Sequence, residues 1–240
     1  MEVQIDVLLK KEEITNEKID GKTVVVFDIL LATSTITKLL EVGATHIYPL
    51  VSKEEVNLFQ NKYEYIIAGE HQGKSIEGFK LPLSTIIAHQ VRGKKVVLLT
   101  TNGTKAIRKS EDDGAKEIFI GSLMNNEALV KYIQFTDIVL ICAASEGEFA
   151  LEDAIGAGHF IYEMNKRKCT NMSDPALATF MLYEQSKEQL YDIISQTKVG
   201  RWLDYHYPEE VAQLISLNRS FIVPAYKKGI ISIKEMEEKG

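Results

Sequence analysis

The sequence predicts an α/β fold, a three-layer α/β/α arrangement with a largely parallel central sheet and a helical C-terminal portion. Two observations lead to this prediction. Apolar, often β-branched runs alternate with stretches of helical period, starting with the continuous run at Thr23–Phe27. After Ser173-Asp174-Pro175 the pattern becomes mostly helical. We expect residues 1–240 to form a single domain, with residues 172–216 as a helical layer or subdomain within it.

Each predicted strand is a short apolar run, and most predicted helices follow such a run. At the amino terminus Val3, Ile5 and Val7 alternate with polar residues, which is the period of a half-buried strand. Six further strands are expected at residues 23–27, 45–50, 65–68, 95–99, 118–120 and 137–142, so the sheet should have about six or seven strands. Helices are expected around residues 36–40, after the Ser52-x-x-Glu55 capping box, and at 84–91, 102–110, 126–134 and 148–165. Residues 12–22 are expected to be a polar connection, and residues 221–233 contain short strand-like runs.

The composition of the 240 residues excludes several classes of protein. Lysine and arginine total 28 and aspartate and glutamate total 34, so the net charge of 28 − 34 = −6 argues against a nucleic-acid partner. No apolar run reaches the roughly 18 residues of a membrane helix, and no basic segment leads into a signal-like core, so we expect a cytoplasmic protein without a membrane partner. Two cysteines make neither a disulfide framework nor a metal site. With only five arginines, an anionic ligand would depend on metal ions and backbone N–H groups.

Polar residues and glycines follow the carboxyl ends of the predicted strands. Ligands of open parallel α/β sheets bind at that edge, so these residues are the candidates for a functional site. They are Asp28 with Ala32-Thr33-Ser34-Thr35, then Gly69-Glu70-His71, Thr100-Thr101-Asn102-Gly103-Thr104, Gly121-Ser122 and Ser145-Glu146-Gly147. Each group alone could cap a helix, but together they indicate a binding edge.

Asp28 ends an otherwise apolar strand, where a carboxylate is either a helix cap or a ligand for a hard cation such as Mg²⁺. The sequence lacks the Asp-x-Asp pattern of aspartyl-phosphate phosphatases, so we favour a metal ligand over a nucleophile. Glu70 and Glu146 are further candidate ligands, with a solvated carboxylate as the alternative for each. His71 follows Glu70 and could donate a proton or contact an anion.

The turn from Thr101 to Thr104 lies between a strand and a helix. Gly103 would let backbone N–H groups approach an anion at the positive end of the helix, although a tight capped turn would have the same sequence. Cys142 lies near the same edge, but the acidic residues that follow it would raise its thiol pKa and disfavour a thiolate nucleophile. We expect Trp202 and its aromatic neighbours to pack.

Six segments of the chain resemble, in the same order, the 2-phosphosulfolactate phosphatase (ComB-like) family over about residues 3–225. They are Val25-Val-Phe-Asp-Ile-Leu-Leu-Ala-Thr-Ser-Thr-Ile36, Ala68-Gly-Glu70, Ser75-Ile-Glu-Gly-Phe79, Thr100-Thr-Asn-Gly-Thr-Lys-Ala106, Ile120-Gly-Ser-Leu123 and Cys142-Ala-Ala-Ser-Glu-Gly-Glu-Phe-Ala-Leu-Glu-Asp153. The sequence departs from the family pattern at Leu31, His71 and Glu148, where the family usually has arginine.

The resemblance implies a Mg²⁺-dependent phosphatase that hydrolyses 2-phospho-3-sulfolactate to 3-sulfolactate and phosphate, a step of coenzyme M biosynthesis in methanogens. We expect Asp28 and Glu70, with Glu146, to hold Mg²⁺. Thr33, Ser34 and the Thr101–Thr104 turn would bind the anionic phosphoester, and His71 would assist catalysis. The missing arginines leave two alternatives, a related phosphatase for another small anionic phosphoester and a non-catalytic anion-binding protein of the same fold. A homodimer is the expected assembly.

Overall fold

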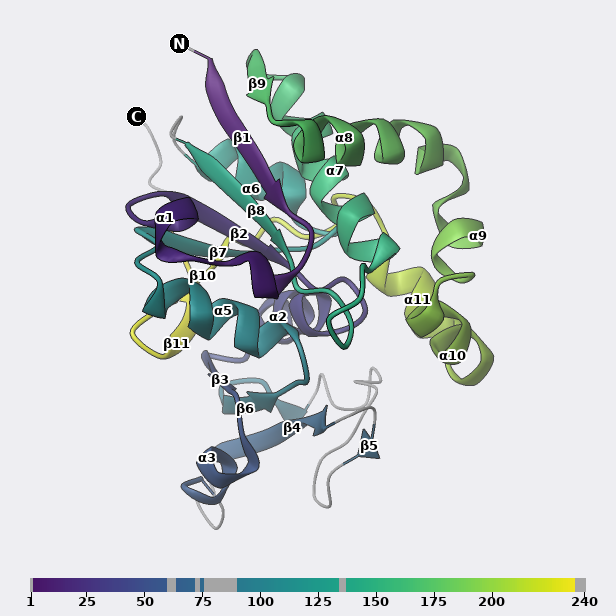
Figure 1. The fold of residues 1–240 in the computed structure, drawn as a ribbon. Coiled ribbons are helices and arrows are strands. Elements are labelled where there is room, and N and C mark those ends of the chain that lie inside the picture. Colours follow the sequence, from purple (N-terminus) through teal and green to yellow (C-terminus); the bar gives the residue numbers. More distant parts are fainter. Residues whose placement is uncertain (1, 60–63, 72–73, 76–89, 134–136, 236–240) are drawn as a thin grey trace.

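The two faces of strand β2 (Thr23–Phe27) point into two separate layers of helices. The computed structural model describes residues 2–59, 64–71, 74–75, 90–133 and 137–235, and only the backbone at 70, 71, 74 and 75. Val24 and Val26 join the core formed with α2 (Ala32–Glu41) and α5 (Gly103–Asp112). Val25 and Phe27 join the core formed with α6 (Asn126–Tyr132) and α7 (Leu151–Asn165). A strand apolar on both faces needs a helical layer on each side, and the predicted three-layer α/β/α class is therefore confirmed (Figure 1).

The described residues contain eleven strands in one sheet, more than the six or seven expected. The strands are β1 (Val3–Leu8), β2, β3 (His46–Leu50), β4 (Tyr65–His71), β5 (Lys74–Ser75), β6 (Lys95–Leu99), β7 (Glu117–Gly121), β8 (Ile138–Cys142), β9 (Thr170–Met172), β10 (Pro224–Lys227) and β11 (Ile230–Ile233). The other helices are α1 (Asn16–Ile19), α3 (Lys53–Asn57), α8 (Asp174–Ser186), α9 (Leu190–Ile194), α10 (Lys198–His206) and α11 (Pro208–Leu214), with 3-10 turns η1 (Lys11–Glu13) and η2 (Lys187–Gln189). No helix among them is long and apolar enough to cross a membrane.

The sheet consists of two parallel blocks joined by an antiparallel hairpin. Its order is β5-β4-β6-β3-β11-β10-β7-β2-β8-β1-β9. Strands β4, β6 and β3 are parallel to one another, and so are β7, β2, β8, β1 and β9. Hairpin β10–β11 pairs antiparallel with β7 on one side and with β3 on the other. Three successive antiparallel pairings reverse the direction, so the two blocks run in opposite senses.

Most predicted elements are found within a few residues of their expected positions. The prediction that residues 12–22 form a plain connection is wrong, because this stretch contains most of η1 and all of α1. The buried side chains of Ile14 and Ile19 anchor it to the core. The Ser52 hydroxyl accepts from the Glu55 N–H at 3.3 Å and starts α3 as the capping pattern predicts. Helices α8–α11 fall within residues 172–216, and α8 packs beside α7 (Figure 1). The helix expected at 84–91 lies, except for its last two residues, outside the described part of the chain.

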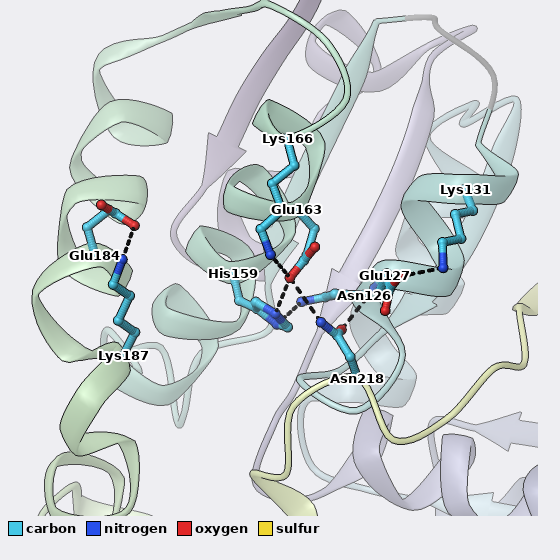
Figure 2. A network of polar contacts seen from close by, with 9 residues as sticks. All are labelled: Asn126, Glu127, Lys131, His159, Glu163, Lys166, Glu184, Lys187 and Asn218. Carbon is cyan, nitrogen blue, oxygen red and sulfur yellow. Dashed lines mark hydrogen bonds and ion pairs between the residues drawn. The ribbon is translucent and has the colours of Figure 1, made fainter.

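A buried polar network fixes α7 to its neighbours, as Figure 2 shows. His159 accepts at Nδ1 from the Asn126 amide at 3.1 Å, so its Nε2–H donates to the Glu163 carboxylate at 3.3 Å. Lys166 and Asn218 also donate to Glu163, each at 2.9 Å. Burial raises the pKa of Glu163, but the hydrogen bonds from His159, Lys166 and Asn218 outweigh it and lower the pKa to about 2. The network therefore depends on an ionised Glu163.

Replacing Glu163 with glutamine is expected to lower the unfolding free energy at pH 7 by about 2 kcal/mol, or roughly 5 °C in Tm. The depressed pKa of Glu163 stabilises the fold fully above pH 4.5, the ordinary value, and this contribution is lost as pH falls toward about 2. Burial also lowers the pKa of His159. As the pH drops below 6.5, the His159 imidazole is therefore protonated more readily in the unfolded chain than in the folded protein, which destabilises the fold. The difference in Tm between wild type and E163Q should therefore shrink as the pH falls from 4.5 to 3.

Thermal melts from pH 7 to pH 3 check the prediction. The matched control is Glu184→Gln, since Glu184 makes a more exposed pair with Lys187 at 3.0 Å (Figure 2). A constant difference between E163Q and wild type from pH 7 to pH 3 would show that the carboxylate charge contributes nothing.

Candidate active site

One cavity of about 520 Å³ opens where the carboxyl ends of β2, β6 and β8 meet. Since β2 and β6 belong to blocks of opposite sense, their carboxyl ends approach each other from two sides instead of lying side by side along one edge. The cavity is lined by Asp28, Leu30, Leu31, Ala32, Thr35, Leu98, Thr100, Thr101, Asn102, Ala144, Ser145, Glu146, Ala150, Glu152, Asp153, Lys198, Val199, Trp202, Leu203 and Tyr207. Its size suits a small organic ligand.

Asp28 is buried at the end of β2 and lines this cavity. Thr33 holds the backbone of Asp28 from both sides, since its hydroxyl donates to the Asp28 carbonyl at 2.9 Å and accepts from the Asp28 N–H at 3.0 Å. The start of α5 comes so close that a Cβ built on Gly103 would lie 2.7 Å from a carboxylate oxygen of Asp28. Only glycine fits at position 103, and the structure thus joins two segments that are 75 residues apart.

Asp153, in the first turn of α7, ties two of the loops around the cavity together. Its carboxylate accepts from the backbone N–H of Ile29 at 2.8 Å and of Ala144 at 3.1 Å. Burial raises the pKa of Asp153 well above its usual range, and the neighbouring carboxylates of Asp28 and Glu152 raise it further, against the effect of the two N–H donors. Asp28, Glu152 and Asp153 thus form an acidic cluster in which the carboxylates of Asp28 and Glu152 repel that of Asp153.

Burial also shifts the pKa of Glu152, a member of this cluster, and of the neighbouring thiol of Cys142. Burial raises the pKa of Glu152, and a hydrogen bond with the side chain of Thr197 opposes the shift. Burial also raises the pKa of the Cys142 thiol, and Asp153 and Glu152 add to the shift. A thiol held neutral in this way agrees with the sequence-based argument against a cysteine nucleophile.

The turn between β6 and α5 presents its first residues to the cavity. Thr101 and Asn102 line the cavity, whereas Gly103 and Thr104 are buried behind it and Thr104 hydrogen-bonds back to Thr100. The Lys11 ammonium donates to Asn102 Oδ1 at 2.9 Å and to the Ala143 carbonyl at 3.3 Å. Because lysine can only donate, the accepting atom of Asn102 must be its oxygen, which leaves the Asn102 Nδ2 group for a ligand.

Several other predicted site residues do not line the cavity or have side chains outside the described residues. Thr33 and Ser34 are fully buried and do not line the cavity, and Thr35 lines it instead. Glu70 is the next-to-last residue of β4, which pairs with β6 in the register Gly69↔Leu99, so the backbone of Glu70 is level with Thr100. The side chains of Glu70 and His71 lie outside the described residues.

Glu146 lines the cavity from an exposed turn, where its carboxylate accepts from the Lys198 ammonium at 2.8 Å. The carboxylate is therefore shared with a lysine instead of joining the buried acidic cluster. Helix α10 supplies Lys198, Trp202 and Leu203 to the cavity wall. Trp202 packs against its aromatic neighbours, with ring centroids 4.7 Å from His206 and 6.2 Å from Tyr207, although the residue remains 49% exposed.

Sequence reasoning missed Lys198, which lines the cavity, and Lys11, which holds Asn102 from behind the cavity wall. Lys11 follows the carboxyl end of β1, which pairs with β8, so extending the survey of strand ends to the first strand would have found it. Lys198 lies on a helix far from any predicted strand end, and no local pattern marks it.

Similar proteins identify the family of this chain. The family model described as 2-phosphosulpholactate phosphatase matches residues 8–229. The chain is 32% identical over 226 residues to a probable 2-phosphosulfolactate phosphatase of Caldanaerobacter subterraneus subsp. tengcongensis, covering 91% of this chain and 93% of the relative. It is 34% identical over 242 residues to a protein of the same description from Clostridium tetani, covering 95% and 100% of the two chains. The match runs through every segment that lines the cavity, and the chain belongs to the 2-phosphosulpholactate phosphatase family.

Proposed function

We propose that this chain is a phosphoric monoester hydrolase that releases phosphate from 2-phosphosulfolactate, leaving 3-sulfolactate. The observation that carries the proposal is the cavity in which Asp28 of one block faces the Thr101-Asn102 turn of the other, within a chain of this family. A carboxylate opposite amide and hydroxyl donors suits a phosphoryl group, whose oxygens take hydrogen bonds and whose charge a bound cation neutralises.

We further propose Mg²⁺ as the cofactor. The buried carboxylate of Asp28 lines the cavity and offers an oxygen ligand, and a divalent cation there would relieve the repulsion between Asp28 and Asp153. Among the described side chains, no three acidic, histidine or cysteine residues form a complete metal-binding group. Asp28 would therefore hold the ion together with Glu70, which the strand register brings level with Thr100. Bound Mg²⁺ would polarise the phosphoryl oxygens and neutralise their developing charge.

The chain's own residues position the ester and restrict water. Thr33 and Gly103 fix the place of Asp28, and Asp153 fixes the loops on either side. Asn102, oriented by Lys11, directs its Nδ2 donor at a phosphoryl oxygen. Trp202, Leu203 and Val199 form an apolar wall that limits access of bulk water. In the reaction the bond between phosphorus and the ester oxygen breaks, water supplies the new oxygen, and the leaving oxygen takes up a proton.

Removal of divalent cations with EDTA is expected to reduce phosphate release from 2-phosphosulfolactate at least about 100-fold, because the phosphoryl charge would face the acidic cluster unscreened. Addition of excess Mg²⁺ should restore the rate. Colorimetric phosphate detection measures the activity, and the rise in Tm with Mg²⁺ reports binding independently of turnover.

Two results would contradict these proposals. Undiminished turnover in EDTA would remove the role of Mg²⁺ and leave the phosphatase activity standing. Absence of turnover at high enzyme concentration, with product binding detected by calorimetry, would identify a non-catalytic anion-binding protein.

A further inference from the structure

The described residues that line the cavity include four carboxylates and a single cation. The acids are Asp28, Glu146, Glu152 and Asp153, and the cation is Lys198. A phosphoester that carries a second anionic group would meet strong repulsion in such a cavity unless a positive charge received that group. Lys198 is the one lysine or arginine among these lining residues that could do so.

The start of α10 fixes the position of Lys198 relative to the acidic cluster. Thr197, the residue before it, accepts from the Gly200 N–H at 3.0 Å and so caps the helix. The Thr197 hydroxyl donates to the Ile194 carbonyl at 3.0 Å, and Thr197 lies close enough to Glu152 to oppose the rise of that pKa. The start of α10 therefore lies beside the acidic cluster, and the exposed Lys198 ammonium reaches Glu146.

The present partner of Lys198 is easily replaced. Glu146 is held at the tip of a tight turn by two hydrogen bonds between Ser145 and Glu148, at 3.0 and 2.9 Å. The side chains of Lys198 and Glu146 are 69% and 64% exposed, and ion pairs as exposed as this one add little stability. The hydrogen bond to Glu146 raises the pKa of Lys198, which stays protonated at neutral pH. A ligand anion entering the cavity could take the place of Glu146 at small cost.

We propose that Lys198 binds the second anionic group of the substrate, its sulfonate or carboxylate, and that Glu146 occupies Lys198 when the cavity is empty. This inference rests on the proposed function, because it divides the cavity into a phosphoryl end at Asp28 and Asn102 and an end for the rest of the substrate at α10. Lys198 then determines which phosphoesters are accepted, and the carboxylate of Glu146 competes with the substrate for it.

Each reaction product should bind at one end of the cavity, phosphate at the phosphoryl end and 3-sulfolactate at the α10 end, so their affinities test the two ends separately. Calorimetry measures the Kd of 3-sulfolactate and of inorganic phosphate for wild type, Lys198→Gln, Lys198→Arg and Lys131→Gln in the presence of Mg²⁺. In K198Q the Kd of sulfolactate should rise about 5- to 20-fold, while that of phosphate changes less than about twofold. K198R should retain sulfolactate binding. K131Q is the matched control, because Lys131 makes an exposed ion pair with Glu127 on α6, away from the cavity.

Turnover and a second variant complete the test. K198Q should raise KM for 2-phosphosulfolactate and leave kcat nearly unchanged. Glu146→Gln should lower the Kd of sulfolactate by about two- to fivefold, since it removes the competitor. The inference is overturned if K198Q weakens the binding of sulfolactate and phosphate equally, or weakens the binding of neither. Loss of metal-dependent turnover in E146Q also overturns it. If wild type releases no phosphate but K198Q still selectively loses sulfolactate, the proposed function fails while the anion site stands.

Discussion

Asp28→Asn is expected to reduce kcat for phosphate release about 1,000-fold while the protein stays folded. Asparagine keeps the shape of the side chain at the end of β2 but removes the charge that would hold Mg²⁺ against the phosphoryl group. The Thr33 hydroxyl bonds the backbone of residue 28, so the local fold does not depend on that charge. Loss of one like charge beside Asp153 should leave Tm unchanged or slightly raised.

The measurement compares initial rates, far-UV circular dichroism and the Mg²⁺-induced shift in Tm for D28N and wild type. Asp113→Asn is the matched control, because Asp113 follows the end of α5 and pairs with Lys109 away from the cavity. D28N should lose both the rate and the metal-induced shift, and D113N should keep both. Retention of more than about a tenth of the activity by D28N would rule out Asp28 as an essential metal ligand.

Asp153→Ala is expected to lower the unfolding free energy by about 3 kcal/mol, or roughly 10 °C in Tm. The substitution leaves the N–H groups of Ile29 and Ala144 buried without an acceptor, and each such group costs about 1–3 kcal/mol. Removing the repulsion from Asp28 and Glu152 offsets part of this loss. Activity should also fall, since Ile29 adjoins Asp28.

Urea unfolding of D153A, D153N and wild type distinguishes the two effects of Asp153. Asparagine keeps one oxygen acceptor and removes the charge, so D153N should be less destabilised than D153A. Equal stability of D153A and wild type would mean that the two N–H groups find other partners. Greater stability of D153N than of wild type would show that repulsion within the acidic cluster outweighs the second hydrogen bond.

The sequence predicts the parallel blocks well because each of their strands is an uninterrupted apolar run. The run at 23–27 is buried on both faces and appears as β2 with the expected bounds. Short edge strands carry no such signal: β9 consists of Thr170, Asn171 and Met172 and forms only because β1 offers a free edge. The reversal of direction between the blocks depends on the β10–β11 hairpin, whose pairing is set by tertiary packing and not by local pattern.

The sequence predicts those residues of the candidate site that directly follow a strand. Asp28, Asn102 and Glu146 line the cavity, and each follows a predicted strand. Whether a residue near a strand end faces the cavity or the core depends on the local turn, so Thr35 lines the cavity while Thr33 is used to hold Asp28. Lys198 comes from α10, and only the packing of the helical layer against the sheet brings it to the cavity.

The hairpin β10–β11 has a consequence for the order in which the protein can be assembled during synthesis. Residues 224–233 follow every strand of both blocks, so both blocks leave the ribosome before the pair of strands that joins them exists. Until then β3 and β7 each have an unpaired edge, which is the kind of surface that recruits other chains into aggregates. Asp28 follows β2 on one side of that junction, and Asn102 follows β6 on the other. A nascent chain that stalls before residue 224 would hold both halves of the cavity but lack the strands that link β3 to β7.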